Sequence, residues 1–245
     1  MTPMTVLPGL RSNLYNQLME IVRRHEWRVT TARAREIQAE LAGQVSRQGR
    51  VENPHLVGGL DISVNRFART GTAAAVVLSF PELKLLETSV VTGPIEFPYV
   101  PGLLSFREAP LTLASCEKLT QTPDFFLVDG QGVAHPRRMG IAAHLGLCLG
   151  VPTIGCAKSR LIGEYEEPGE SAGNYADLID KGEVIGAVLR TRTGVKPVYV
   201  SIGHNIDLAS AVRLVLGCCR GHRLPEPARL AHQAAGKGTG SRVEG

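Results

Sequence analysis

The sequence lacks the cysteine pattern that staples a small secreted fold or holds a zinc ion. Its five cysteines are an odd number, no Cys-x-x-Cys occurs, and two of the thiols are adjacent. These features argue against both a disulfide framework and a structural zinc site. A reducing compartment is the simplest interpretation, and we expect a cytoplasmic protein. The cysteines are Cys116, Cys148, Cys156, Cys218 and Cys219.

Long hydrophobic runs are also missing. The longest apolar region, GIAAHLGLCLGVPTIGCA, is interrupted by His144 and Pro152, so it does not predict a membrane span. The first residues, MTPMTVLPGLRSNLY, do not contain the long apolar segment of a signal peptide. We therefore expect no membrane partner.

Two common catalytic loops are absent as well. No Gly-Lys-Ser/Thr of a nucleotide-triphosphate loop occurs, and no Gly-x-Ser-x-Gly of a serine hydrolase. In GQGVAH, His135 stands where a dinucleotide-binding loop needs its third glycine. The formal charge of +4 permits an anionic partner without requiring one.

What the chain does contain is enough apolar sequence for one full domain. Hydrophobic residues make up 43% of the 245 residues and charged residues 20%. Residues 10–24 place leucines at helical spacing, and a second helix is predicted to begin at Thr30 or Thr31, with Ile37, Leu41 and Val45 on one face. We expect residues 1–25 to form an N-terminal extension, 26–235 the domain, and the glycine-rich residues 236–245 a disordered tail.

The middle of the chain predicts a mixed sheet. Three short Val- and Leu-rich segments, at 56–64, 71–80 and 83–91, are joined by brief turns and therefore indicate an antiparallel meander. After residue 92 helices and strands alternate, so the fold class is α/β, with antiparallel and parallel strands in one sheet flanked by helices. The later predicted elements are a helix at 103–120, a strand at 124–130, a helix at 139–150, a strand at 151–159, a hairpin of 183–191 with 196–204, and a helix at 207–219.

Isolated acids interrupt these apolar segments. Asp61 lies within the first strand and Asp129 at the end of FFLVDG, where burying a carboxylate is costly unless a cation balances it. Either acid alone has about even odds of being a cap or a structural hydrogen bond. Two on neighbouring strands favour a hard-cation site such as Mg²⁺, and a third candidate, Glu108, begins a helix next to Arg107.

A rigid aromatic segment precedes that helix. Tyr99 lies between Pro98 and Pro101, and Gly102 follows, so the segment is stiff and poor in backbone donors. A ring on a rigid loop suits a protein that fills the space left by a base turned out of a duplex. From the residues alone, a tyrosine that packs over a sheet edge is the simpler explanation.

Four motifs in order resemble the endonuclease V family. They are PYVPGLLSFRE, VDGQGVAHPRR, PTIGCAKSRL and RLPEPARLAH, and the resemblance covers roughly residues 27–233. It implies a ribonuclease H-like fold and a Mg²⁺-dependent nuclease, with Mn²⁺ as a possible substitute. Small departures from the family pattern are Val100, Gln131, Cys156 and Ala228.

The resemblance also implies roles for individual residues. Asp61, Glu108 and Asp129 would hold the metal, and Lys158 would lie near the reacting phosphate. The wedge segment Pro98–Gly102 would probe the DNA, with Gly102, Gly130 and Gly132 as walls for the extruded base. DNA contacts would further come from His135, Arg137, Arg138 and His204, the two histidines being more often packing residues than proton carriers.

The function implied is DNA repair. The family cleaves DNA containing deoxyinosine or other deaminated bases at the second phosphodiester on the 3′ side, leaving a 3′-hydroxyl and a 5′-phosphate. Two alternatives stay open: a nuclease of the same fold that acts on inosine in RNA or on DNA structures, and a binding module without catalysis. The three acids favour a nuclease over a pure binder. No oligomer is predicted.

Overall fold

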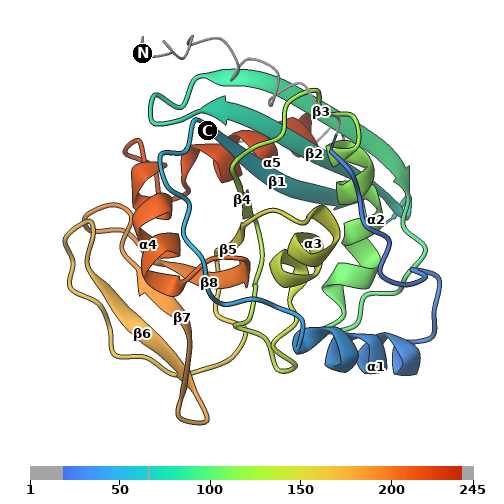
Figure 1. Cartoon of the computed structure of the whole chain (residues 1–245), viewed down its shortest axis with the longest axis horizontal. Coiled ribbons are helices and arrows are strands. Elements are labelled where there is room, and N and C mark those ends of the chain that lie inside the picture. The colour runs from blue at the N-terminus through green and yellow to red at the C-terminus, as the bar shows by residue number, and fades with distance from the viewer. Residues whose placement is uncertain (1–18, 66, 239–245) are drawn as a thin grey trace, which may run out of the picture.

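One mixed sheet organises the protein. The computed structural model describes residues 19–65 and 67–238, and its strands follow the order β3-β2-β1-β4-β5-β8-β7-β6 (Figure 1). In the described part of the chain no helix is long and apolar enough to cross a membrane. The strands are β1 (Leu56–Asn65), β2 (Thr70–Ser79), β3 (Leu85–Pro94), β4 (Phe125–Val128), β5 (Thr153–Ala157), β6 (Tyr175–Asp180), β7 (Glu183–Leu189) and β8 (Val198–His204).

The predicted antiparallel meander and parallel strands are both present. β1 pairs antiparallel with β2, and β2 with β3, whereas β4 lies parallel to β1 and β5 parallel to β4. The predicted mixed α/β sheet flanked by helices is therefore confirmed. Parallel pairing places the ends of β1, β4 and β5 near one another.

The far half of the sheet contains one strand that the sequence pattern did not reveal. The predicted pairing of β7 with β8 is confirmed, but β6 adds an outer strand to β7. β6 is mostly exposed, and its sequence YADLID lacks the dense Val and Leu of the buried strands. Its pairing with β7 is thus decided by the hairpin rather than by apolar content.

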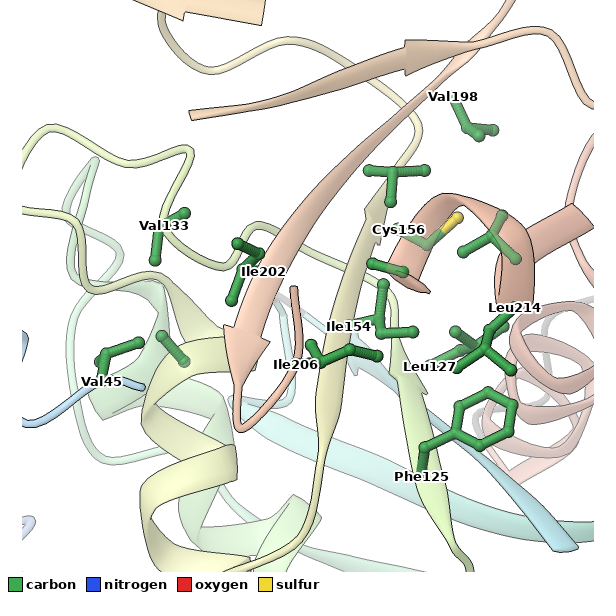
Figure 2. Packing of buried hydrophobic residues seen from close by; sticks show 14 of the residues in the cluster. Val45, Phe125, Leu127, Val133, Ile154, Cys156, Val198, Ile202, Ile206 and Leu214 are labelled. Carbon is green, nitrogen blue, oxygen red and sulfur yellow. The ribbon is translucent and has the colours of Figure 1, made fainter. Parts of the chain in front are cut away.

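Helices cover both faces of the sheet (Figure 1). α2 packs on β2 and β3 and α3 on β5 and β8, while α5 contacts β1 and β2 and α4 contacts β7 and β8. Alternate residues of β4 serve the two faces: Phe126 packs in the cluster with α2 and α3, whereas Leu127 packs toward Leu214 of α4 (Figure 2). The helices are α1 (Thr31–Ala42), α2 (Leu104–Cys116), α3 (Ile141–Leu149), α4 (Leu208–Gly217) and α5 (Glu226–Gly238).

The second predicted helix, α1, begins where expected. The Thr30 hydroxyl accepts a hydrogen bond from the Arg33 amide, as an N-cap does. Ile37 and Leu41 face the core as predicted, but the helix ends at Ala42, so Val45 packs from the following loop. Gln38 is buried on the same face.

Two terminal expectations need correction. The predicted helix over 10–24 lies partly outside the described residues, and its described part, 19–24, is not helical. There the chain binds to the end of α3: Val22 N donates to Cys148 O at 2.8 Å, and Arg24 Nε donates to Leu147 O at 3.0 Å. At the other end, α5 continues to Gly238, three residues into the expected disordered tail, because its buried Ala231 and Ala235 hold it against the sheet.

A glycine allows α5 to approach the sheet closely. A Cβ on Gly59 of β1 would lie 2.1 Å from the carbonyl oxygen of Pro227, in the first turn of α5. Only glycine therefore permits this distance between helix and strand. The approach brings His232 of α5 to Asp61 of β1, where the Nδ1–Oδ2 distance is 2.6 Å.

Candidate active site

A cavity of about 410 Å³ opens where β1, β4 and β5 meet the start of α2. Most of the residues singled out in the sequence line it, although they come from segments up to 97 positions apart. The structure thus brings together the acids, the lysine and part of the wedge segment. These residues are Asp61, Tyr99, Gly102, Glu108, Asp129, His135 and Lys158.

Asp61 lies on β1, and Asp129 directly follows the neighbouring parallel strand β4. The Asp129 amide donates to Leu60 O at 3.0 Å, which aligns the end of β4 with Asp61. The Asp61 side chain is only 8% exposed, and its Oδ1 accepts from the Ile62 amide at 2.8 Å. Burial and the Asp61 charge raise the pKa of Asp129, while the Lys158 ammonium lowers it. The two carboxylates therefore repel each other unless a cation lies between them.

Lys158 supplies one cation. Its Nζ lies 2.5 Å from Asp129 Oδ2, and Arg223 Nη2 donates to the Lys158 carbonyl at 2.6 Å. The lysine is therefore held at the end of β5, facing the acids, rather than on the open surface. The role that the resemblance implies for Lys158 stays a prediction.

His232 is a site residue that the sequence analysis missed. One ligand atom each from Asp61, Asp129 and His232 lie within 4.8 Å of one another. The hydrogen bond to Asp61 raises the pKa of His232. The only signal was its place in the motif RLPEPARLAH, because a histidine on an amphipathic helix gives no other indication of its partner.

Glu108 lies beside this group but does not belong to it. Burial, the largest cause, and the charges of Asp61 and Asp129 raise its pKa to about 8, while Arg107 opposes the shift. Arg107 is itself held by a 2.9 Å hydrogen bond to Phe97 O. At neutral pH the Glu108 carboxyl is thus mostly protonated without a cation, although it lines the same cavity.

The donor set fits a divalent cation. Carboxylate oxygens are the ligands of hard ions such as Mg²⁺ and Mn²⁺, and a neutral imidazole nitrogen is accepted more readily by Mn²⁺. The ammonium of Lys158 and the ring of His232 already lie against Asp129 and Asp61. The Lys158 ammonium and a ring nitrogen of His232 therefore lie where a metal would neutralise the same acids.

The wedge segment is a defined turn with an exposed ring. Leu103 N donates to Val100 O at 2.9 Å, and Gly102 has φ +77°, so residues 100–103 form a type II turn with Pro101 and Gly102 at its centre. Tyr99 is 69% exposed. Pro98 lines a second cavity, on the other side of the segment, and Pro101 is exposed.

The remaining predicted contacts divide into two groups. His135 Nε2 donates to Gly102 O at 3.0 Å, and Arg137 Nη2 donates to the same oxygen at 2.8 Å, so both support the wedge segment. Burial, the largest cause, and the charge of Arg137 lower the pKa of His135 to about 4, so the ring is neutral. Arg138 instead pairs with Asp180 and Glu183 at the β6–β7 hairpin, and His204 Nδ1 accepts from Ser46 N, both away from the cavity lining.

Two buried polar atoms of the cavity lining have no hydrogen-bond partner among the residues that the structure describes. They are Ser105 Oγ and Gln131 Oε1. Gln131 Nε2 donates to Ser159 O at 2.9 Å, which sets the orientation of the amide. Gly130 lines the cavity as expected, but Gly132 packs against the backbone of Ile202 and is not among the lining residues. Unpaired buried atoms are costly unless a ligand engages them.

Comparison with known proteins identifies the family of this chain. The family model described as endonuclease V matches residues 39–233. The chain is 52% identical over 217 residues to an endonuclease V of Dehalococcoides mccartyi, covering 89% of this chain and 97% of that protein. A relative from Gloeobacter violaceus is 52% identical over 211 residues, covering 85% of this chain and 86% of the relative.

Solved structures show the same similarity. The endonuclease V of Streptomyces avermitilis has a TM-score of 0.84 at 39% identity, covering 91% of this chain and 98% of that one. That of Ciona intestinalis, in complex with a 24mer DNA containing an inosine followed by a ribo-adenosine, has a TM-score of 0.73 at 32% identity, covering 85% and 96%. This chain therefore belongs to the endonuclease V family and is a nuclease.

Proposed function

We propose that this protein cleaves DNA at deoxyinosine and other deaminated bases, at the second phosphodiester on the 3′ side. The observation that carries the proposal is the group of Asp61, Asp129 and His232 beside a cavity that the wedge segment borders. The inosine-containing DNA bound by the Ciona intestinalis relative supports the same substrate class. The products would be a 3′-hydroxyl and a 5′-phosphate. The five free thiols support a cytoplasmic location.

Mg²⁺ is the proposed cofactor, with Mn²⁺ as a substitute. Asp61 and Asp129 would hold it, with Glu108 and His232 as further ligands. When bound, such an ion supplies Lewis-acid activation of the phosphate and a more acidic water. Metal titration would measure the number of ions bound.

We call Asp61, Asp129 and His232 the metal group. Separate tasks are proposed for the side chains at this site. Lys158, which lies against Asp129, would neutralise the charge that builds on the phosphate during attack. His232, hydrogen-bonded to Asp61, would orient that carboxylate. Glu108 can hold a proton at neutral pH, and it must release that proton before it can bind a cation.

Lesion selection would depend on the wedge segment and the cavity. Hypoxanthine pairs weakly, so turning it out of the duplex costs less than turning out a normal base. Tyr99 would fill the gap in the stack, and the free Ser105 Oγ and Gln131 Oε1 would offer polar contacts in the cavity. Arg137 supports the turn, and we propose that it also lies close to the phosphates.

Matched oligonucleotides test the substrate. The protein, with Mg²⁺, is incubated with strands that are identical except for deoxyinosine, inosine in RNA, or the unmodified base. Cleavage of the deoxyinosine strand two phosphodiesters 3′ of the lesion is the expected result. Equal cleavage of unmodified DNA would contradict lesion selectivity, and preference for inosine in RNA would favour the alternative substrate.

Substitution of one acid tests the chemistry. Asp129→Ala should abolish cleavage while leaving DNA binding largely intact, because Asp129 belongs to the metal group and not to the wedge segment. Asp177→Ala removes an exposed carboxylate on β6 and is the matched control. Full cleavage by Asp129→Ala would sink the proposed mechanism, and a binding loss equal to the loss of cleavage would point to a binding module.

A further inference from the structure

A buried amide joins helix α1 to the wedge segment. Gln38 lies on α1, which packs beside the sheet and contributes none of the acids, yet its side chain lines the cavity and is only 1% exposed. A glutamine is rarely buried to this extent without a structural or functional partner.

The side-chain amide of Gln38 makes three hydrogen bonds. Gln38 Nε2 donates to Gly102 O at 3.0 Å and to Met139 O at 3.0 Å. Its Oε1 accepts from Arg137 Nε at 2.6 Å. The orientation is unambiguous, because both carbonyls can only accept and the guanidinium can only donate.

Three donors converge on the carbonyl of Gly102. Besides Gln38, they are His135 Nε2 at 3.0 Å and Arg137 Nη2 at 2.8 Å. A carbonyl oxygen has two lone pairs, so three donors occupy it fully. The neutral His135 donates because its Nδ1 already accepts from the Arg137 amide at 3.2 Å. Gln38, His135 and Arg137 together form what we call the Gly102 clamp.

The Gly102 clamp acts on the last residue of the wedge segment. Gly102 is the φ +77° position of the type II turn, and Leu103 leads directly into α2. Pro98 and Pro101 stiffen the segment locally, but they do not set its position relative to the acids. The Gly102 clamp sets this position, because it ties the turn both to α1 and to the loop after Asp129.

We infer that Gln38 is a positioning residue that holds the wedge segment and the adjoining cavity wall in register with the metal group. The inference rests on the proposed function. A misplacement of about 1 Å in such a wall is enough to cost about 100-fold in rate. Gln38 is therefore a determinant of lesion selectivity although it lies outside the catalytic sheet.

Gln38→Glu removes the donor of the side chain and keeps its acceptor. The carboxylate keeps an acceptor for Arg137 but cannot donate to Gly102 O. We expect the single-turnover rate on deoxyinosine duplex to fall about 10- to 100-fold, and cleavage of unmodified DNA, which turns no base into the cavity, to fall less, so that discrimination decreases. Gln44→Glu makes the same change on an exposed residue just after α1 and should leave both rates at the wild-type value.

A second variant and a second readout keep the test decisive. Gln38→Met preserves the side-chain volume without burying a charge, and it replaces Gln38→Glu if that variant is unfolded. Hydrogen exchange of residues 98–104 should accelerate in either variant, while the exchange of β4 stays as in the wild type. Wild-type discrimination, or wild-type exchange at 98–104, in a folded variant would overturn the inference.

The two proposals fail in different ways. If the wild-type protein does not distinguish deoxyinosine from unmodified DNA, the proposed function is wrong. Hydrogen exchange of residues 98–104 still tests the clamp in that case, because it needs no substrate. If the wild type discriminates and the folded variants do so equally, the proposed function stands and the role of Gln38 is wrong.

Discussion

At the scale of single residues, the site is a balance of charge in a partly buried cavity. Two carboxylates, Asp61 and Asp129, are offset by the lysine and histidine that lie against them. Glu108 has no such partner in contact among the described residues, and burial raises its pKa so that it holds a proton instead. A divalent cation would take over the balancing role of the lysine, the histidine and this proton.

The protonation of Glu108 predicts a pH-dependent metal affinity. Its pKa is raised to about 8, so below that pH a cation must displace a proton, and affinity should rise as the pH increases from about 6 to 8. Calorimetry in buffers of different ionisation enthalpy should detect proton release on Mg²⁺ binding at pH 7. Glu108→Gln should lose this release. Binding at pH 7 without any proton release would contradict the assignment.

At the scale of elements, the site depends on how closely α5 lies on β1. Only because residue 59 is glycine can the first turn of α5 approach the strand, and only then does His232 reach Asp61. α1 has the corresponding role for the wedge segment through Gln38. Two helices that supply none of the three predicted acids thus position the groups around them.

Gly59→Ala tests the packing of α5. The added Cβ would lie 2.1 Å from Pro227 O, so the helix must shift, and we expect a loss of about 1–3 kcal/mol in the free energy of unfolding. The His232–Asp61 hydrogen bond should weaken as well, and cleavage should fall. Urea unfolding and the cleavage rate are the measurements.

Gly43→Ala is the matched control for that substitution. Gly43 has φ −69° and nothing within 4 Å of the added Cβ, so the change should be neutral or stabilise by about 0.4–1 kcal/mol. Equal destabilisation by both substitutions would show that the close approach of α5 is not the cause.

At the scale of the whole molecule, buried neutral histidines connect stability to pH. Burial lowers the pKa of His135 to about 4 and that of His144 to about 3. His144 is fully buried, and its Nε2 lies 2.6 Å from Nε2 of His25. Both histidines therefore stay neutral in the folded protein at a pH where the unfolded chain takes up protons.

The sign of the pH dependence follows from these shifts. Between pH 6.5 and about 4 His135 and His144 bind more protons in the unfolded chain than in the folded protein, so their contribution to the free energy of unfolding falls as the pH is lowered. The loss is at most about 1.4 kcal/mol per pH unit for each histidine. Urea unfolding from pH 7 to pH 4.5 should show it, with a shallower slope for His135→Gln. Equal slopes for the wild type and His135→Gln would contradict the burial of the His135 ring as a neutral group.

The sequence by itself determined the mixed sheet, the strands that carry Asp61 and Asp129, and the turn chemistry of Pro101 and Gly102. These are local properties: apolar content, turn residues and the preference of glycine for positive φ operate within a few positions. Four motifs in a defined order along the chain also indicated the family. The exposed strand β6 and the course of residues 19–24 were not predictable in this way, because neighbours elsewhere in the chain decide them.

Only the tertiary structure decided which groups meet. His232 joins Asp61 across 171 positions, and Gln38 joins Gly102 across 64. It also directed Arg138 to an ion pair with the β6–β7 hairpin, whereas Arg137, its neighbour in the sequence, reaches Gly102. Side-chain partners at such separations depend on how helices pack against a sheet, and no local pattern encodes that geometry.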